Sequence, residues 1–322
     1  MRTLSAALIA AMFFATLGAH AAEMEKVRFC RATGQISSLP YIAEDQGFFK
    51  AQGLDVTFLT TTASKLCQDT LLGNQADISL IGEAPFAHLG FSAHTLRLLA
   101  KVGYNPVIAL YARKDRGISV EKDIKGKTIA YLPGTVSYFY LAHLLDRVGL
   151  GFKDIKAVAL QPPAMPQALA GGLIDGFVIW IPWGHMAMAA MGDKVVRLYD
   201  PSIYKERSFL VATDSSAKNH PAIVTKVLKA LMQAETYIYE HPAEAKKLIA
   251  HEINISEQIE AEFWPEIDFR IKLDKKISTL LADDAHYITR DDPNFKDKPI
   301  PDYSRFIDAS FLGDVAPERV QP

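Results

Sequence analysis

The sequence lacks the short motifs by which many enzymes and metal proteins are recognised. It contains no Gly-x-Ser-x-Gly, and Gly126-Lys127-Thr128 matches only the end of a phosphate-binding loop, because Glu121 stands where that loop needs its first glycine. Its nine histidines form no His-Glu-x-x-His run, and two cysteines are too few for a cysteine-rich zinc site. We therefore expect no catalytic residues, no metal and no other cofactor.

An excess of one charge sign is missing as well. The chain has 35 Lys and Arg against 37 Asp and Glu, a formal charge of −2, and these residues are interspersed rather than gathered in long runs. The acidic residues between positions 283 and 292 are interpreted as a solvated loop. Because proteins that bind nucleic acid usually carry a basic patch, the composition argues against a nucleic-acid partner and favours a small molecule.

Beyond residue 21 no apolar run approaches the ~20 residues needed to span a bilayer. The first residues differ: Arg2, the apolar segment 4–17 and the ending Ala19-His20-Ala21 have the features of a cleaved secretory signal peptide. We predict a signal peptide over residues 1–21 and export to the periplasm. Cys30 lies well downstream of the cleavage point, so lipid attachment is disfavoured and the mature protein should diffuse freely.

Cysteine is scarce, with only Cys30 and Cys67 in the chain. An oxidising compartment permits a disulfide between them. The alternative is a pair of buried thiols that pack as small apolar groups. Sequence separation alone leaves both readings open, because a disulfide depends on the geometry of the two side chains.

Segments typical of strands alternate with segments typical of helices along most of the chain. In the first part we expect strands at 26–30, 54–59, 76–81 and 95–102 and helices at 38–52, 64–72 and 85–92. In the second part we expect strands at 107–112, 128–132, 155–159, 177–180 and 195–198 and helices at 138–148, 167–171 and 184–191. Such alternation is typical of α/β lobes with parallel sheets.

The chain is expected to cross between two such lobes twice, near Leu110 and near Leu210. A strand at 209–213 is followed by an almost wholly helical tail that packs back onto the first lobe. We thus assign residues 22–110 and 210–322 to the first lobe and 111–209 to the second. The predicted fold class is α/β, with two lobes, each a mainly parallel sheet flanked by helices, and a two-strand hinge that allows closure around a ligand.

The segment from Leu160 to Trp183 places an aromatic side chain at the end of a strand. Prolines bound its elements, and residues 177–179 form a short apolar run that ends at Trp180. In an open α/β sheet, ligands bind beyond the carboxyl ends of the strands, so Trp180 would stand at the mouth of a site. Packing in the core is the alternative, and position alone does not separate the two.

Three strand-to-helix junctions carry small polar residues, over residues 60–64, 82–85 and 134–137. Free backbone N–H groups and the positive end of a helix favour an anion at such junctions, although each is also explained by ordinary N-capping. Glu83 is the exception, since a carboxylate opposes a bound anion. It either complements the helix dipole or pairs with a cationic or N–H-rich part of the ligand.

Ala43, Gly47-Phe48-Phe49 and Gly53-Leu54, with Val56, stand in a familiar order: a helix that ends in a Gly-aromatic-aromatic turn, then Gly-Leu-x-Val entering a strand. This order resembles the nitrate, sulfonate and taurine family of solute-binding proteins for ABC importers, which also includes binders of thiamine pyrimidine precursors. The similarity extends through residues 73–81, 123–130 and, most closely, 160–182, where taurine-binding members are similar. The resemblance implies the periplasmic binding protein fold of type II.

The resemblance also implies a set of ligand positions, carried over residue by residue. They are Gln35, Ser37, Thr62, Ser64, Glu83, Thr135, Ser137, Trp180, Arg207 and Ser208. Two of these positions depart from the family pattern. Sulfonate binders usually have a small hydroxyl residue where this chain has Glu83, and taurine binders carry an acidic residue near the position of Ser208.

From this resemblance we expect a monomeric periplasmic protein that captures a small anionic or zwitterionic organic solute and delivers it to the permease of an ABC importer. An amino-heterocycle such as a thiamine pyrimidine precursor is the alternative ligand. An enzyme of the same fold is a further alternative, although the pyrimidine-synthesis relatives bear a cysteine-rich iron motif that is absent from this sequence. A sensor whose closed form binds a signalling protein is the third.

Overall fold

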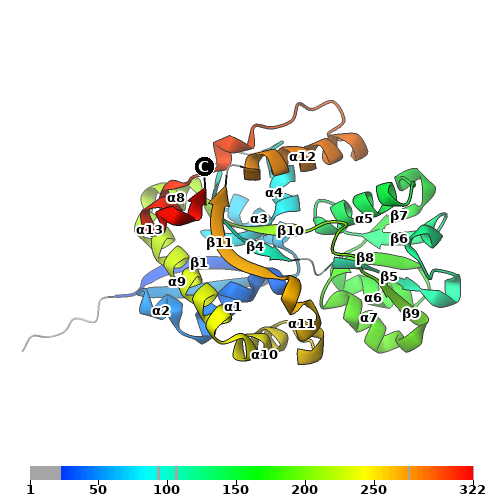
Figure 1. Cartoon of the computed structure of the whole chain (residues 1–322). Helices are drawn as coiled ribbons and strands as arrows, with labels where there is room; N and C mark the ends of the chain where they lie inside the picture. Colours follow the sequence, from blue (N-terminus) through cyan, green and yellow to red (C-terminus); the bar gives the residue numbers. More distant parts are fainter. Residues whose placement is uncertain (1–22, 93–94, 106–107, 275, 322) are drawn as a thin grey trace, which may run out of the picture.

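The computed structural model describes residues 23–92, 95–105, 108–274 and 276–321, so the predicted signal peptide lies outside the described residues. The chain folds into two lobes, each built on one sheet with helices on both faces (Figure 1). No helix among the described residues is long and apolar enough to cross a membrane.

The first lobe is built on a seven-stranded sheet in the order β12-β11-β4-β10-β3-β1-β2. Its strands are β1 (Glu25–Ala32), β2 (Leu54–Thr61), β3 (Ile78–Gly82), β4 (Leu96–Asn105), β10 (Glu206–Thr213), β11 (Asp268–Asp274) and β12 (Val320–Gln321). Strand β3 is fully buried, as expected for an apolar run at the centre of a sheet that is covered on both faces.

The second lobe is built on a five-stranded sheet in the order β7-β6-β8-β5-β9. Its strands are β5 (Ile108–Arg113), β6 (Thr128–Tyr131), β7 (Lys156–Ala159), β8 (Gly176–Trp180) and β9 (Val195–Leu198). The predicted strand that ends at Trp180 is therefore present, and Trp180 is its last residue.

Both sheets are mixed rather than mainly parallel. In the first lobe β1 runs parallel to β2 and β3, whereas β10 runs antiparallel to both β3 and β4. In the second lobe β6 runs parallel to β7 and β8, whereas β5 runs antiparallel to β8 and β9. The antiparallel strands β5 and β10 are those that follow the two crossings between the lobes.

Helices cover the faces of both sheets. Those of the first lobe are α1 (Ser38–Asp45), α2 (Phe48–Ala51), α3 (Ser64–Leu72), α4 (Glu83–Leu89), α8 (Asp214–Asn219), α9 (Pro221–Glu240), α10 (Pro242–Glu252), α11 (Glu257–Phe263), α12 (Lys276–Asp291) and α13 (Ser310–Val315). Those of the second lobe are α5 (Val136–Arg147), α6 (Met165–Ala170) and α7 (Trp183–Met191). The single predicted helix over 38–52 is two helices, because Gly47 with φ +71° interrupts it.

The sequence-based lobe boundaries fall inside two strands, β5 and β10, whereas the chain crosses between the lobes outside these strands. β5 belongs wholly to the second sheet and β10 wholly to the first, so the chain crosses between β4 and β5 and again over residues 199–205. We therefore propose lobe boundaries at 105–108 and 199–205 in place of 110/111 and 209/210.

Two further expectations about the C-terminal part are corrected. The tail is not almost wholly helical, because β11 pairs with β4 inside the first sheet. The acidic residues after position 282 are not a solvated loop: they belong largely to α12, and Asp284 is buried.

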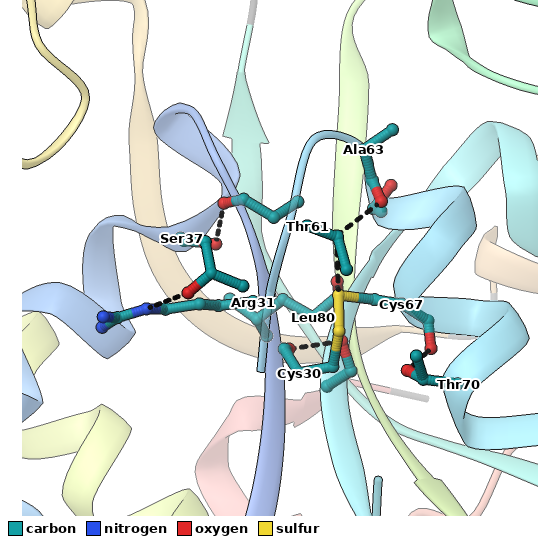
Figure 2. The surroundings of a disulfide bond; sticks show 12 residues. Cys30, Arg31, Ser37, Thr61, Ala63, Cys67, Thr70 and Leu80 are labelled. Carbon is teal, nitrogen blue, oxygen red and sulfur yellow. Dashed lines mark hydrogen bonds between the residues drawn. A yellow bond between two sulfur atoms is a disulfide. The ribbon is translucent and has the colours of Figure 1, made fainter. Parts of the chain in front are cut away.

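Cys30 and Cys67 are joined by a disulfide, with a Cα–Cα distance of 5.4 Å (Figure 2). The bond ties β1 to α3, which packs on the same sheet, and both residues are fully buried. Thr61 and Thr70 surround it, the Thr61 hydroxyl lying 3.3 Å from Cys67 Sγ. The disulfide thus holds the start of α3 beside the end of β1, where the cleft described next is formed.

Candidate functional site

A narrow cleft, partly open to solvent, lies between the two lobes. Its lining residues are Ala32, Thr33, Gly34, Gln35, Ile36, Ala63, Ser64, Thr135, Val136, Trp180 and Glu206. They follow the carboxyl ends of β1, β2, β6 and β8, which is where ligands bind in open α/β sheets. Glu206 joins them from the amino end of β10, because β10 is antiparallel to β3 and so begins at the edge where β3 ends.

Trp180 meets the first lobe across this cleft. Gly34 has φ +127°, a conformation that favours glycine, and a Cβ there would lie 3.3 Å from the Ile181 carbonyl oxygen and 3.5 Å from Cδ1 of Trp180. Glycine thus lets the loop after β1 approach the indole closely. Trp180 stays partly exposed in the cleft, so its role is not confined to core packing.

Ser64 is the first residue of α3 and lines the cleft. The residue before it, Ala63, is extended and offers no side-chain cap, so the first N–H groups of α3 are not satisfied by a capping side chain. The Ser64 Oγ accepts a hydrogen bond from the backbone N–H of Gly82 at 3.2 Å, which leaves its own proton available to a ligand. This junction has the features of an anion site.

The corresponding junction of the second lobe is mostly occupied by internal hydrogen bonds. Thr135 caps α5, accepting from the Ser137 backbone N–H at 3.2 Å and donating to the Leu132 carbonyl at 2.8 Å. The Ser137 hydroxyl donates to the Val178 carbonyl at 2.6 Å and is fully buried. N-capping therefore explains these two residues, although Thr135 still lines the cleft.

Glu206 is the acidic group of the cleft, and the sequence interpretation missed it. Its carboxylate packs against Gly82, where a Cβ would lie 2.1 Å from Oε1 of Glu206 and 3.2 Å from the Ser64 hydroxyl. Burial, reinforced by the negative charge of Glu83, raises the pKa of Glu206 to about 8.

Glu83, for which ligand contact and a helix-dipole role were both left open, is not among the residues that line this cleft. It is buried, and both of its carboxylate oxygens accept from Arg207 Nη1, at 2.9 and 2.8 Å, while the Arg207 backbone N–H donates to Oε2 at 3.2 Å. Both residues line a different cavity, together with Asp284, which accepts a hydrogen bond from Tyr204 at 3.1 Å. Glu83 and Arg207 thus form an ion pair, and neither is among the residues that line the cleft at Gly34 and Trp180.

Of the ten predicted ligand positions, the structure brings Gln35, Ser64, Thr135 and Trp180 to the cleft. The other six do not line it: Ser37, Thr62, Glu83, Ser137, Arg207 and Ser208. Ser37 is buried and donates to the Ala32 carbonyl at 2.7 Å, and Ser208 is buried within β10. Glu206 lines the cleft instead because it is the first residue of β10, at the edge where the cleft forms, whereas Ser208 lies further into the strand.

Below the cleft, Glu260 of α11 is fully buried beside Gln35. The Gln35 side-chain amide donates to Oε2 of Glu260, and the Ser38 hydroxyl donates to Oε1 of Gln35 at 2.9 Å. The second carboxylate oxygen of Glu260 has no hydrogen-bond partner among the described residues. Burial raises the pKa of Glu260 to about 7. Across the described part of the chain, no cluster of three His, Cys, Asp or Glu residues is arranged to hold a metal.

Comparison with known proteins assigns the chain to a family. The model of the family described as "NMT1/THI5 like" matches residues 37–245, well over half of the sequence. The chain belongs to the NMT1/THI5-like family. The match begins just after the loop that follows β1 and ends in α10, so it includes six of the eleven residues that line the cleft.

Relatives of this NMT1/THI5-like protein include proteins named as binding proteins and one named as a biosynthetic enzyme. A "Putative binding protein" of Brucella abortus is 23% identical over 224 residues, covering 66% of this chain and 67% of the relative. The 4-amino-5-hydroxymethyl-2-methylpyrimidine phosphate synthase of Schizosaccharomyces pombe is 28% identical over 148 residues, covering 42% and 39%.

A solved structure shows the same fold over nearly the whole chain. The alkanesulfonate-binding protein SsuA from Xanthomonas axonopodis pv. citri, bound to MOPS, superposes with a TM-score of 0.76 at 18% identity. The superposition covers 90% of this chain and 100% of SsuA. The two-lobed periplasmic binding protein fold that the resemblance implied is thereby confirmed.

Proposed function

We propose that this protein is the periplasmic solute-binding component of an ABC importer and that its ligand is a small zwitterion, an organic anion that also carries an ammonium or amidine-like group. The observation that carries the proposal is that Ser64, at the start of α3, and Glu206 lie beside the same point of Gly82, where a Cβ would lie 3.2 Å from the Ser64 hydroxyl and 2.1 Å from Oε1 of Glu206. The helix start and the Ser64 hydroxyl suit an anionic group, and the Glu206 carboxylate suits a cationic one.

The size and shape of the cleft support a short ligand. Ser64 and Glu206 both lie against the same point of the chain, so the two charged ends of the ligand would be only a few bonds apart. Trp180 would cover the remainder, and closure of the lobes would remove it from water. A taurine-like aminosulfonate has this charge distribution. Capture at micromolar affinity needs only about −8 kcal/mol, which a handful of such contacts supplies.

An amino-heterocycle such as a thiamine pyrimidine precursor is the second candidate, because Glu206 can also accept from a ring nitrogen and its amino group, and one relative is named for pyrimidine phosphate synthesis. The same relative favours an enzyme of this fold as a further alternative. An importer component would release its ligand chemically unchanged, in partnership with a membrane permease and as a monomer.

A thermal-shift screen of the mature protein tests the proposal. The panel contains taurine, ethanesulfonate, nitrate, an aromatic acid and an aminopyrimidine, each against the wild type, Glu206→Gln and the exposed control Glu240→Gln. We expect taurine to raise the melting temperature of the wild type and of Glu240→Gln, and to act much more weakly on Glu206→Gln. Equal responses to taurine and ethanesulfonate in all three proteins would contradict the zwitterion. Recovery of the bound compound in altered form by mass spectrometry would favour the enzyme.

A further inference from the structure

Helix α11 belongs to the first lobe, yet its C-terminal end contacts the second. Glu262 Oε1 lies 2.6 Å from Nη2 of Arg197, which is in strand β9 of the other lobe. The Arg197 guanidinium also lies 4.7 Å from the ring centroid of Phe263, the last residue of α11. Figure 1 shows α11 below the junction of the lobes, on the side of α6 and α7.

Phe263 is the apolar anchor of this contact. Its side chain is 1% exposed, and it packs edge-on against Tyr199 with a centroid distance of 5.4 Å and against His185 at 6.0 Å. Tyr199 follows β9 and His185 lies in α7, so aromatic side chains of the second lobe enclose a side chain of the first.

The middle of the same helix is hydrogen-bonded to a residue that lines the ligand cleft. Glu260, one turn before Phe263, accepts the side-chain amide of Gln35, whose residue lines the cavity. Residues three apart on a helix lie on one face, so Glu260 and Phe263 face the same side of α11. A single short helix therefore joins the loop after β1, which forms one wall of the cleft, to the contact surface of the second lobe.

We propose that α11 is an interlobe latch, in which Glu262 and Phe263 hold the lobes together and Glu260 links the latch to the ligand loop around Gln35. The latch stabilises the closed arrangement of the lobes, whichever solute binds. Opening of the lobes must separate Arg197 from Glu262 and expose Phe263. Loss of the latch therefore shifts the ligand-free protein toward an open form and loosens the loop at residues 33–36.

Charge reversal in the ligand-free mature protein tests the latch. The variants are Glu262→Arg, Arg197→Glu and the double variant that restores the pair in the opposite sense, with Glu257→Arg on the exposed first turn of α11 as the control. Glu262 is half exposed in its pair with Arg197, so reversing its charge leaves the core intact. Small-angle scattering gives the radius of gyration, and amide hydrogen exchange reports on residues 33–36.

We expect each single reversal to increase the radius of gyration and to speed amide exchange at residues 33–36 by threefold or more, with both effects reversed in the double variant and absent in Glu257→Arg. Circular dichroism melts check that each variant is folded. If Arg197→Glu does not fold, Glu262→Arg alone provides the test. An unchanged radius of gyration in Glu262→Arg, or faster exchange in Glu257→Arg of the same size, would overturn the latch. Neither readout uses a ligand, so the outcome is independent of the solute proposed above.

Discussion

Protonation of Glu206 should control which solute this protein binds. Its pKa of about 8 means that in the ligand-free protein the group is mostly a neutral carboxylic acid at pH 6. An ammonium group requires the carboxylate, so binding of taurine at that pH must expel a proton. Ethanesulfonate, which has the same length but no amine, requires no such loss.

The magnitude follows from the pKa. Two pH units below the pKa about 1% of the carboxyl groups are ionised, so taurine should bind about a hundredfold more weakly at pH 6 than above pH 8, a difference of about 2.7 kcal/mol. Its dissociation constant should fall about tenfold per pH unit from pH 6 to about pH 8 and then level off. The affinity rises with pH because the proton must leave for the ligand to bind, and the raised pKa of Glu206 places this rise between about pH 6 and pH 8.

Isothermal titration calorimetry at pH 6, 7 and 8 measures the effect, in two buffers of different ionisation heat so that released protons are counted. Glu260, with its pKa of about 7, also titrates in this range, but it does not line the cleft and affects both ligands alike. The ratio of the taurine and ethanesulfonate constants therefore isolates Glu206. Glu206→Gln should remove the pH dependence of that ratio, whereas Glu240→Gln should leave it unchanged. Parallel pH profiles for the two ligands in the wild type would refute the reasoning.

Three further predictions concern the cleft wall, the buried ion pair and the disulfide. Trp180→Ala should weaken binding of the best solute of the screen at least tenfold, which is about 1.4 kcal/mol by calorimetry. An unchanged dissociation constant would show that Trp180 has only a packing role. Glu83→Gln should lower the free energy of unfolding in urea by about 3 kcal/mol, because it leaves the Arg207 charge unpaired, while solute affinity stays within twofold; a binding loss as large as that of Glu206→Gln would place Glu83 in the site after all. Replacing Cys30 and Cys67 by Ser opens a loop of sequence separation 37 and should cost about 4 kcal/mol in urea unfolding, whereas an unmoved midpoint would show that the bond adds no stability.

The lobes could be predicted from sequence because their strands and helices alternate locally. Strand β11 was missed, although Phe269, Ile271 and Leu273 are buried and alternate with Arg270 and Lys272, which is the period-2 pattern of a strand. The helical periodicity of the long segment before it dominated the interpretation. Counting matches to the strand pattern within the tail would have found it.

The candidate site was predicted only in part, because its chemistry depends on long-range pairing. The partners Glu83 and Arg207 are 124 residues apart, and no local pattern shows that one neutralises the other. Glu206 was missed because its position depends on the antiparallel direction of β10, which brings the beginning of that strand to the edge where the parallel strands end. The resemblance to taurine binders pointed to an acidic residue near Ser208, and Glu206 lies two positions away on the same strand.

The charge balance around the start of β10 explains why a cationic ligand group is expected at Glu206 in particular. Two carboxyl groups, Glu83 and Asp284, lie near one guanidinium, Arg207, and Glu83 takes it in a buried ion pair. Burial and the charge of Glu83 then raise the pKa of both Asp284 and Glu206. Asp284 is supported by the Tyr204 hydroxyl and faces the other cavity. Glu206 lines the cleft, where a bound cation would lower its pKa and keep it ionised at neutral pH.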